Sequence, residues 1–439
     1  MSIINRLLQL RNKPSQKQIL ELLSWSKQNA NIIEPLDSIN YDINKLNKLD
    51  KLLENKRVVY LGEEDHWIHE KTVYRIIMLR YLISRGWNYI GEEIGWSDGI
   101  RIGKYIDNGQ ESYLEKIATY GYTGALRTDR EDKPQGILKS SSDNYPLAEF
   151  KSEQLFLTKT LKEINFKKEK DSDRIHFFGF DIDAVAGGGY EDVEILLSPY
   201  KHKTAVVKIL EMLNRIPGET INDEISRLKM VLATIKELEL NLKEFLDEKQ
   251  YNLLYEHVLT LLDSFKFNLI ANSADTYKQL NLAMAAREKA IHRHVKFVLS
   301  MMEPSDKLVL MGHNRHLSKD ISAIKNGGAA PPGGGHVPSV GTYINQLLPG
   351  QVFSIWQLFN QGSSSQPYVN LNSKYVSRPD TLNAILAKIG SNFLMPTAGP
   401  RLFEKSLDIV GIYNAEYRTA ITKQADAIFF IDEVSPLRK

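Results

Sequence analysis

Two histidines and a set of carboxylates in this chain follow short apolar runs, where their side chains could act on a bound substrate. The run at residues 58–61 leads into Glu63 and His66, and the run at residues 308–311 leads into His313. Histidine has an ordinary pKa of about 6.5, so a neutral imidazole can take a proton from water while a carboxylate orients the ring. These residue types suggest hydrolysis by a water molecule that a histidine activates.

Two further apolar runs end in acidic residues. Residues 88–91 lead into Glu93, and residues 175–180 lead into Asp181. All four runs are short and rich in β-branched and aromatic residues, which is typical of buried strands. Ligands of such sheets bind outside the carboxyl ends of the strands. If the four strands lie side by side and parallel, the histidines and carboxylates converge on one crevice.

The elements around these runs predict an α/β protein with a central, mostly parallel sheet flanked by helices. Further strands are expected at residues 352–355 and 426–431, and leucine and isoleucine at helical spacing predict a long helical insertion. At 439 residues the chain is long enough for one large domain with an insertion. The predicted organisation is an N-terminal helical cap at 1–55, a catalytic domain in two parts at 56–198 and 303–439, and the helical insertion at 199–302.

A helix is expected from residue 70 to residue 85, with Gly86 suited to end it. Most of its circumference is apolar, so it should be buried on more than one side. Arg75 lies in its first half, and a buried guanidinium without a carboxylate partner would cost several kcal/mol. The acidic residues after the neighbouring strands are its expected partners.

Composition excludes several classes of function. Lys and Arg total 56 against 54 Asp and Glu, and the formal charge of +2 indicates no nucleic-acid-binding surface. The chain has no cysteine, which rules out disulfides, a thiol nucleophile and cysteine-ligated zinc. No run approaches the ~20 apolar residues that span a bilayer, and residues 1–16 lack the core of a signal peptide. We therefore expect a cytoplasmic protein with no nucleic-acid or membrane partner.

Two glycine-rich stretches lie where loops at the edge of the site are expected, at residues 187–189 and 326–335. Neither carries the lysine and serine or threonine of a phosphate-binding loop, so nucleotide binding is not indicated. The adjacent residues Arg287 and Glu288 lie in an amphipathic helical pattern, and we interpret them as a solvated or interhelical ion pair, with contact to the pocket as the alternative.

The candidate catalytic and binding residues resemble, in order and at plausible spacing, those of the erythromycin esterase family. The resemblance begins with the pattern G-E-x-x-H-x-x-x-E and extends to the C-terminus. Its pieces are Gly62 to Glu70, Arg75, Glu93, Gly179-Phe180-Asp181, Arg287-Glu288, Gly312-His313-Asn314-x-His316 and residues 425–434.

This resemblance implies hydrolysis of a macrolide lactone or related ester by water, with no acyl-enzyme, no required metal and no cofactor. Carried over by position, His66 is expected to be the base that activates water. Its expected partners in the pocket are Glu63, Arg75, Glu93 and His313. His316 and Asp181 are expected to contact the substrate.

Three residues beside the expected base depart from the family pattern. Glu64 and Asp65 stand where small residues are usual, and Trp67 stands where a glycine is usual. We interpret all three as substrate-binding residues, and they predict a substrate other than a macrolide. Transfer of an acyl or other group in natural-product biosynthesis, or binding without hydrolysis, is the alternative that this departure leaves open.

Two other enzyme mechanisms fit parts of the sequence. Gly95-x-Ser97-x-Gly99 matches the nucleophile elbow of serine hydrolases, but it begins after the predicted strand has ended, so we prefer direct attack by water. A metal hydrolase is the second alternative. Its ligand sets would be His66, His69 and Glu70, or His313 and His316 with Asp181.

Overall fold

The structure, a computed structural model, describes residues 13–115, 151–170, 173–183, 188–214, 216, 218–325, 332–366, 371–411 and 415–438. The strands are β1 (Asn31–Ile32), β2 (Val58–Glu63), β3 (Tyr89–Gly95), β4 (His176–Asp181), β5 (Leu308–His313), β6 (Val352–Gln366), β7 (Leu371–Val376), β8 (Asn392–Pro396), β9 (Ser406–Val410), β10 (Glu416–Ala420) and β11 (Ala427–Val434). The helices are α2 (Gln16–Asn29), α3 (Lys48–Leu53), α4 (His69–Ser84), α5 (Trp96–Asn108), α6 (Ser112–Glu115), α7 (Lys151–Phe166), α8 (Gly188–Leu197), α9 (Thr204–Leu213), α10 (Ile221–Glu237), α11 (Glu239–Lys243), α12 (Glu248–Asn272), α13 (Tyr277–Met301), α14 (Val340–Leu347) and α15 (Leu382–Leu386).

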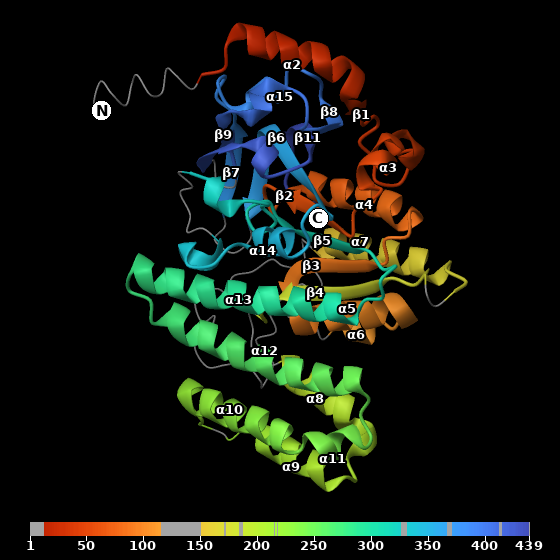
Figure 1. Ribbon diagram of the computed structural model, residues 1–439, viewed down its shortest axis with the longest axis vertical. Coiled ribbons are helices and arrows are strands. Elements are labelled where there is room, and N and C mark those ends of the chain that lie inside the picture. The colour runs from red at the N-terminus through yellow and green to blue at the C-terminus, as the bar shows by residue number, and fades with distance from the viewer. Residues whose placement is uncertain are drawn as a thin grey trace.

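The predicted α/β architecture with a mostly parallel central sheet is confirmed. The strand order is β1-β8-β11-β6-β2-β5-β3-β4, with β7 paired to β6 (Figure 1). Strands β11, β6, β2, β5, β3 and β4 are parallel to one another, whereas β1, β8 and β7 pair antiparallel. The four strands expected to carry the site are therefore consecutive neighbours, and their carboxyl ends lie at one edge of the sheet.

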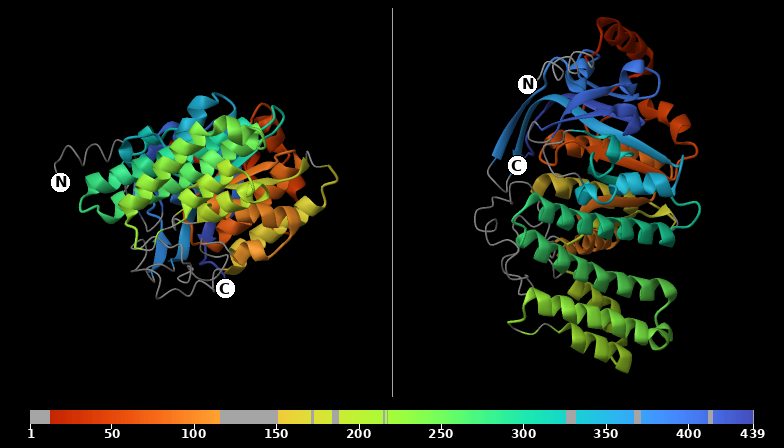
Figure 2. Two further views of the ribbon diagram at one scale, coloured as in Figure 1. Left: turned by 90° about the horizontal axis from the view of Figure 1, so that it is seen from below. Right: turned by 60° about the vertical axis from the view of Figure 1, so that its left-hand side comes forward.

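Helices cover both faces of the sheet. On one face, apolar residues of α4, α5 and α7 pack against β2, β3 and β5, including Ile77, Tyr105 and Leu157. On the other face, α13 and α14 pack against the same strands, for example through Ile291 and Val340. Figure 2 shows this layering from two further directions. The expected buried helix corresponds to α4, and Gly86 follows it with a φ of 83°.

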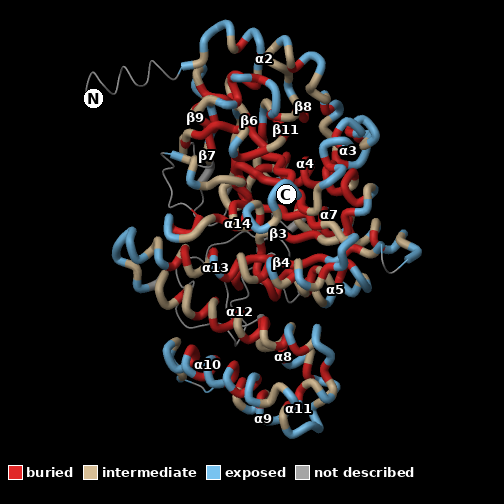
Figure 3. The backbone as a smooth tube through the Cα atoms, viewed as in Figure 1, coloured by how far each residue is buried: buried red, intermediate tan, exposed pale blue. Residues whose placement is uncertain are grey.

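The chain between β4 and β5 forms the predicted run of helices, from α8 to α13 (Figure 1). Its outer helices have an apolar core of their own, which includes Val206, Leu228 and Leu254. Buried residues fill the sheet layers and also the contacts among these helices (Figure 3). None of the described helices is long and apolar enough to cross a membrane.

Several short strands were not predicted. β1 lies within the segment that we expected to be wholly helical, between α2 and α3. β7, β8, β9 and β10 all pair antiparallel with a neighbour, and each has five or six residues. β7, β9 and β10 mix polar with apolar residues, so they lack the continuous apolar signal of buried parallel strands, and in β8 this signal is only three residues long. Residues 187 and 326–331 of the two glycine-rich stretches lie outside the described residues.

Helix α5 lies so close to β4 that the contact requires glycine. A Cβ atom on Gly99 would lie 1.7 Å from the backbone nitrogen of Gly179, and one on Gly179 would lie 2.1 Å from the carbonyl oxygen of Gly95. Gly99 of the elbow-like pattern therefore serves helix–strand packing, together with Gly179 of β4.

We predict that Gly99→Ala destabilises the protein by about 3 kcal/mol or more, because the added methyl group must push α5 away from β4. Gly390→Ala is the matched control, since its Cβ would meet nothing closer than 3.9 Å. Thermal and urea unfolding measure both variants. Equal stability of the two would contradict the packing role of Gly99.

Candidate active site

His66 and Glu63 form a carboxylate–imidazole pair at the carboxyl end of β2. Glu63 is the last residue of the strand, and its Oε1 lies 2.5 Å from Nδ1 of His66. Because a carboxylate can only accept, Nδ1 carries the proton, and in the neutral ring the lone pair is then on Nε2. Glu63 is buried, whereas 35% of the His66 side chain is exposed. The pair therefore holds a basic nitrogen where solvent or a substrate can reach it.

Arg75 of α4 lies beneath this pair and bridges two carboxylates. Its guanidinium nitrogens lie 2.7 Å from Glu63 Oε2 and 2.7 Å from Glu92 Oε1. Burial alone would raise the pKa of Glu63, but Arg75 is the main influence that outweighs burial and lowers the pKa to about 2. The expectation that buried acids partner Arg75 is met, although Glu92 was not singled out. Glu63 is thus a permanent anion beside the imidazole.

A buried lysine, which sequence reasoning did not single out, holds the loop after β2. The ammonium of Lys71 donates a hydrogen bond of 2.7 Å to the backbone carbonyl of His66. Burial lowers the pKa of Lys71, and the nearby carboxylate of Glu63 opposes this shift. Lys71 lies on α4, one helical turn before Arg75, so both cations face the same loop.

The tail of the chain lies across this loop. His69 donates its backbone N–H to the carbonyl of Ser435 at 2.8 Å, and Ser435 donates two hydrogen bonds of 2.7 Å to Glu70. Ile68 and Pro436 form a further backbone bridge. The C-terminal residues therefore brace the segment that carries His66.

His313 lies beside His66 at the end of the neighbouring strand. The two rings have centroids 5.3 Å apart, and Glu63 and His313 are paired in the β2–β5 register. Nδ1 of His313 accepts the backbone N–H of Arg315 at 3.2 Å, and Nε2 faces the carbonyl of Glu64 at 3.2 Å. Burial lowers the pKa of His313 to about 3, so the ring is neutral. Both of its nitrogens are used in holding the loop.

His316 lies between two carboxylates. Its Nδ1 is 3.0 Å from Glu288 Oε2, and its Nε2 is 3.4 Å from Glu93 Oε1. Burial would lower the pKa of His316, but Glu93 and Glu288 outweigh it and raise the pKa above the ordinary value. The two carboxylates therefore favour the protonated form of His316 at the edge of the site.

Arg287 of α13 connects Glu93 to Asp181. Its Nε lies 2.8 Å from Asp181 Oδ1, its terminal nitrogen contacts Asp181 Oδ2, and the same nitrogen lies 3.2 Å from Glu93 Oε1. Burial would raise the pKa of Glu93, but the positive charges of His316 and Arg287 hold it below the usual value. The carboxylates at the ends of β3 and β4 are thus both ion-paired.

The interpretation of Arg287 and Glu288 as a solvated or interhelical pair is wrong. Arg287 reaches Asp181, and Glu288 is 1% exposed, binds His316 and accepts the backbone N–H of Val340 at 2.5 Å. Adjacent Arg and Glu inside an otherwise amphipathic helix were the available signal. The pattern could not show that α13 passes over the ends of β3 and β4.

The three residues that depart from the family pattern lie in different surroundings. Glu64 is buried and accepts hydrogen bonds of 2.7 Å from the Asn314 amide and of 2.7 Å from the Tyr417 hydroxyl. Asp65 is buried and accepts from the Tyr375 hydroxyl. Trp67 is partly exposed, with its ring edge-on to His66 at a centroid distance of 6.2 Å. Of the three, Trp67 is the one placed to meet a substrate.

The expectation that the strand ends before the elbow-like pattern is wrong, because β3 continues to Gly95 and α5 begins at Trp96, which places Ser97 at a strand-to-helix junction. Ser97 lies within α5, and its hydroxyl donates 2.7 Å to Asp183 Oδ2 while its backbone N–H donates 2.9 Å to Oδ1. The Ser97 side chain is buried. Among the described residues its hydroxyl is bonded to a carboxylate and not to an imidazole.

The residues proposed as metal ligands in the alternative mechanism do not form a metal site in the described part of the chain. There, no group of three or more His, Asp or Glu residues has the arrangement of a metal site. His66, His69 and Glu70 instead face separate partners, which are Glu63, Glu153 and Ser435.

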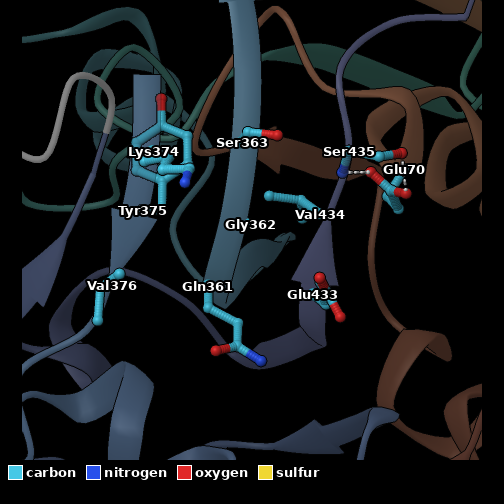
Figure 4. Close-up of a pocket in the computed structure, with 10 residues that line it drawn as sticks. All are labelled: Glu70, Gln361, Gly362, Ser363, Lys374, Tyr375, Val376, Glu433, Val434 and Ser435. Atoms are coloured by element: carbon cyan, nitrogen blue, oxygen red, sulfur yellow. Dashed lines mark hydrogen bonds between the residues drawn. The ribbon is translucent and has the colours of Figure 1, made fainter. Parts of the chain in front are cut away.

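A polar groove of about 640 Å³ adjoins the loop that carries His66 (Figure 4). Strands β6, β7 and β11 form its floor through residues such as Gln361, Lys374 and Glu433, and Glu70 with Ser435 forms one wall. Tyr375 lines the groove and donates its hydroxyl to Asp65, which ties the groove to the loop.

Comparison with known proteins gives a consistent result. A model of the erythromycin esterase family matches residues 84–434. The chain is 22% identical over 378 residues to "Putative hydrolase YbfO" of Bacillus subtilis strain 168, over 81% of this chain and 76% of that protein. The crystal structure of a succinoglycan biosynthesis protein matches with a TM-score of 0.69 and 15% identity, over 97% of this chain and 100% of that one.

A mutant of the erythromycin esterase EreC in its open conformation also shares the fold. It matches with a TM-score of 0.62 and 17% identity, over 92% of this chain and 97% of that one. The family match includes Glu93, Asp181, His313 and His316 and begins after the segment from Glu63 to Arg75.

We predict that Arg75→Met destabilises the protein by about 3–5 kcal/mol, because Glu63 and Glu92 lose the cation that neutralises them in the interior. Lys201→Met is the control, since Lys201 and its partner Glu194 are largely exposed, and we expect little change. Urea unfolding at neutral pH measures both. A small effect of Arg75→Met would show that the carboxylates do not depend on it.

We also predict that Glu64 makes the protein less stable as pH rises. Burial raises the pKa of Glu64 from 4.5 to about 8, so the folded protein holds this proton more tightly than the unfolded chain does. Its contribution to the free energy of unfolding is complete below pH 4.5 and is lost as pH rises toward about 8.

Glu64→Gln imitates the protonated carboxyl and should reduce this decline in stability between pH 5 and pH 8. Part of the decline should remain, because burial also raises the pKa of Asp183, to about 7. Urea unfolding across this pH range tests the prediction. An unchanged slope in the variant would contradict it.

Proposed function

The chain belongs to the erythromycin esterase family, and on this premise we propose that it is a hydrolase that opens an ester or lactone with water activated by His66. The observation that carries the proposal is the 2.5 Å contact between Glu63 and His66 on a ring that remains partly exposed. A buried carboxylate that is ion-paired to Arg75 gives the imidazole a fixed tautomer.

The proposed reaction begins with a water molecule hydrogen-bonded to Nε2 of His66. As its oxygen attacks the carbonyl carbon of the substrate, its proton passes to Nε2. The imidazolium that forms is stabilised by Glu63, whose lowered pKa keeps it anionic throughout. Such a base contributes about 10²- to 10⁴-fold in rate.

We assign two groups, His316 and Arg287, to stabilising the negative charge that develops on the carbonyl oxygen of the substrate. His316 and Arg287 lie at the ends of β3, β4 and β5, and their side chains are 12% and 21% exposed. Fixed charge in such a setting stabilises a developing oxyanion more than the same charge in water does. Asp181 is assigned to holding Arg287 in place, and His313 to holding the loop beside the base.

Trp67 is assigned to substrate selection, because its ring lies edge-on to His66 and is partly exposed. Glu64 and Asp65 are assigned to a supporting role, since both are buried against tyrosine hydroxyls. Attack by an alcohol or amine in place of water would give group transfer with the same base, and the test below separates these reactions.

The test is incubation of the purified protein with a panel of macrolides and simple carboxylic esters, followed by mass spectrometry. We expect a product that has gained one water, a loss of about 10²- to 10⁴-fold in rate for His66→Ala, and little change for Ser97→Ala. Ser97→Ala needs a stability control, because the Ser97 hydroxyl is buried against Asp183.

Three outcomes would overturn the proposal. Full activity of His66→Ala would show that His66 is not the base. Loss of hydrolysis in a folded Ser97→Ala would favour an acyl-enzyme formed on Ser97. Products formed only when an alcohol or amine acceptor is added would favour group transfer.

A further inference from the structure

A second carboxylate–imidazole pair lies three residues beyond the first. Nδ1 of His69 is 2.6 Å from Oε1 of Glu153, which also accepts the backbone N–H of Arg438 at 2.8 Å. The Glu153 side chain is 5% exposed and that of His69 is 15% exposed. Nδ1 faces the carboxylate, while Nε2 has no hydrogen-bond partner among the described residues. The arrangement repeats that of Glu63 and His66.

The two pairs share one set of buried contacts. Gln154, the neighbour of Glu153 on α7, donates a hydrogen bond of 3.1 Å to Glu92. Glu92 is bound to the same Arg75 that binds Glu63. Both imidazoles also belong to the loop and first turn between β2 and α4. The second pair is therefore built onto the same side of the sheet as the first.

Hydrolysis of an alkyl ester needs a proton donor as well as a base. The alcohol oxygen leaves with the electron pair of the broken C–O bond, and an alkoxide is a poor leaving group until it is protonated. In the reaction proposed above, His66 takes a proton from the attacking water and becomes an imidazolium. No separate group has yet been assigned to donate a proton to the leaving oxygen on the other side of the carbonyl carbon.

We propose that His69, held by Glu153, is the general acid of this enzyme and protonates the leaving alcohol oxygen. This inference rests on the proposed function. Water adds to the carbonyl carbon and gives its proton to His66, the C–O bond breaks toward the alcohol oxygen, and the proton on Nε2 of His69 passes to that oxygen. Exchange with solvent then returns a proton to His69 and removes one from His66.

The surroundings of Glu153 suit this role. Burial alone would raise the pKa of Glu153, but the hydrogen bond with His69 outweighs burial and lowers the pKa. Glu153 therefore remains an anion beside the His69 ring. His69 stands at an unspecified position of the pattern G-E-x-x-H-x-x-x-E, so the family resemblance assigns it no role.

The test compares two esters that share an acyl group and differ in the leaving group, ethyl butyrate and p-nitrophenyl butyrate. p-Nitrophenolate leaves without a proton donor, whereas ethoxide does not. We expect His69→Gln to lower kcat/KM for ethyl butyrate by about 10²-fold or more and to leave p-nitrophenyl butyrate nearly unchanged. Glu153→Gln should show the same split more weakly, and it provides a second variant if His69→Gln does not fold.

The controls separate this inference from the proposed function. His66→Gln should lower kcat/KM for both esters, and His202→Gln, at an exposed position of the insertion, should lower neither. Equal losses on both esters in folded His69→Gln, or no loss on either, would overturn the general acid alone. If the wild type hydrolyses neither of these esters nor any member of the macrolide and ester panel, the proposed function fails and this inference fails with it.

Discussion

The site depends on one buried ion-pair network, in which the Arg75 guanidinium bridges Glu63 and Glu92. Removing two carboxylates from water costs several kcal/mol each unless a cation accompanies them, and Arg75 meets both from one helix. Because Glu63 remains ionised there, its second oxygen can orient His66 and balance the charge that His66 acquires. The same network reaches α7 through Glu92, and α7 in turn supplies Glu153 to His69.

The order of the strands explains why these residues meet. β2, β5, β3 and β4 are consecutive and parallel, so Glu63, His313, Glu93 and Asp181 emerge at one edge of the sheet. α4 crosses from β2 to β3 on one face and brings Arg75, while α13 lies on the other face and brings Arg287. Anionic strand ends are thus met by a cation from each helical layer. His66 remains partly exposed at this edge, where a reacting ester would meet it.

Sequence reasoning reached the parts of this fold that have strong local signals. The buried parallel strands are continuous apolar runs, and the polar residues that follow them mark their carboxyl ends. Glu63, His66 and Arg75 could be associated because they lie within one strand–loop–helix unit. Arg287 could not, because it is 106 residues away from Asp181 and only the packing of α13 brings the two together. Short antiparallel strands such as β7 and β8 were not predicted for a similar reason, because they are defined by the strands with which they pair rather than by their own residues.

The central claim is that Glu63 fixes the tautomer of His66 so that Nε2 can accept a proton from water. The most direct measurement is ¹⁵N NMR of the histidine side chains at neutral pH, with His66→Gln to identify the signals of His66. The account predicts a neutral ring with its proton on Nδ1, hydrogen-bonded to Glu63, and an unprotonated Nε2. A neutral ring with its proton on Nε2 would contradict it, because the basic nitrogen would then face Glu63 and no water could be activated.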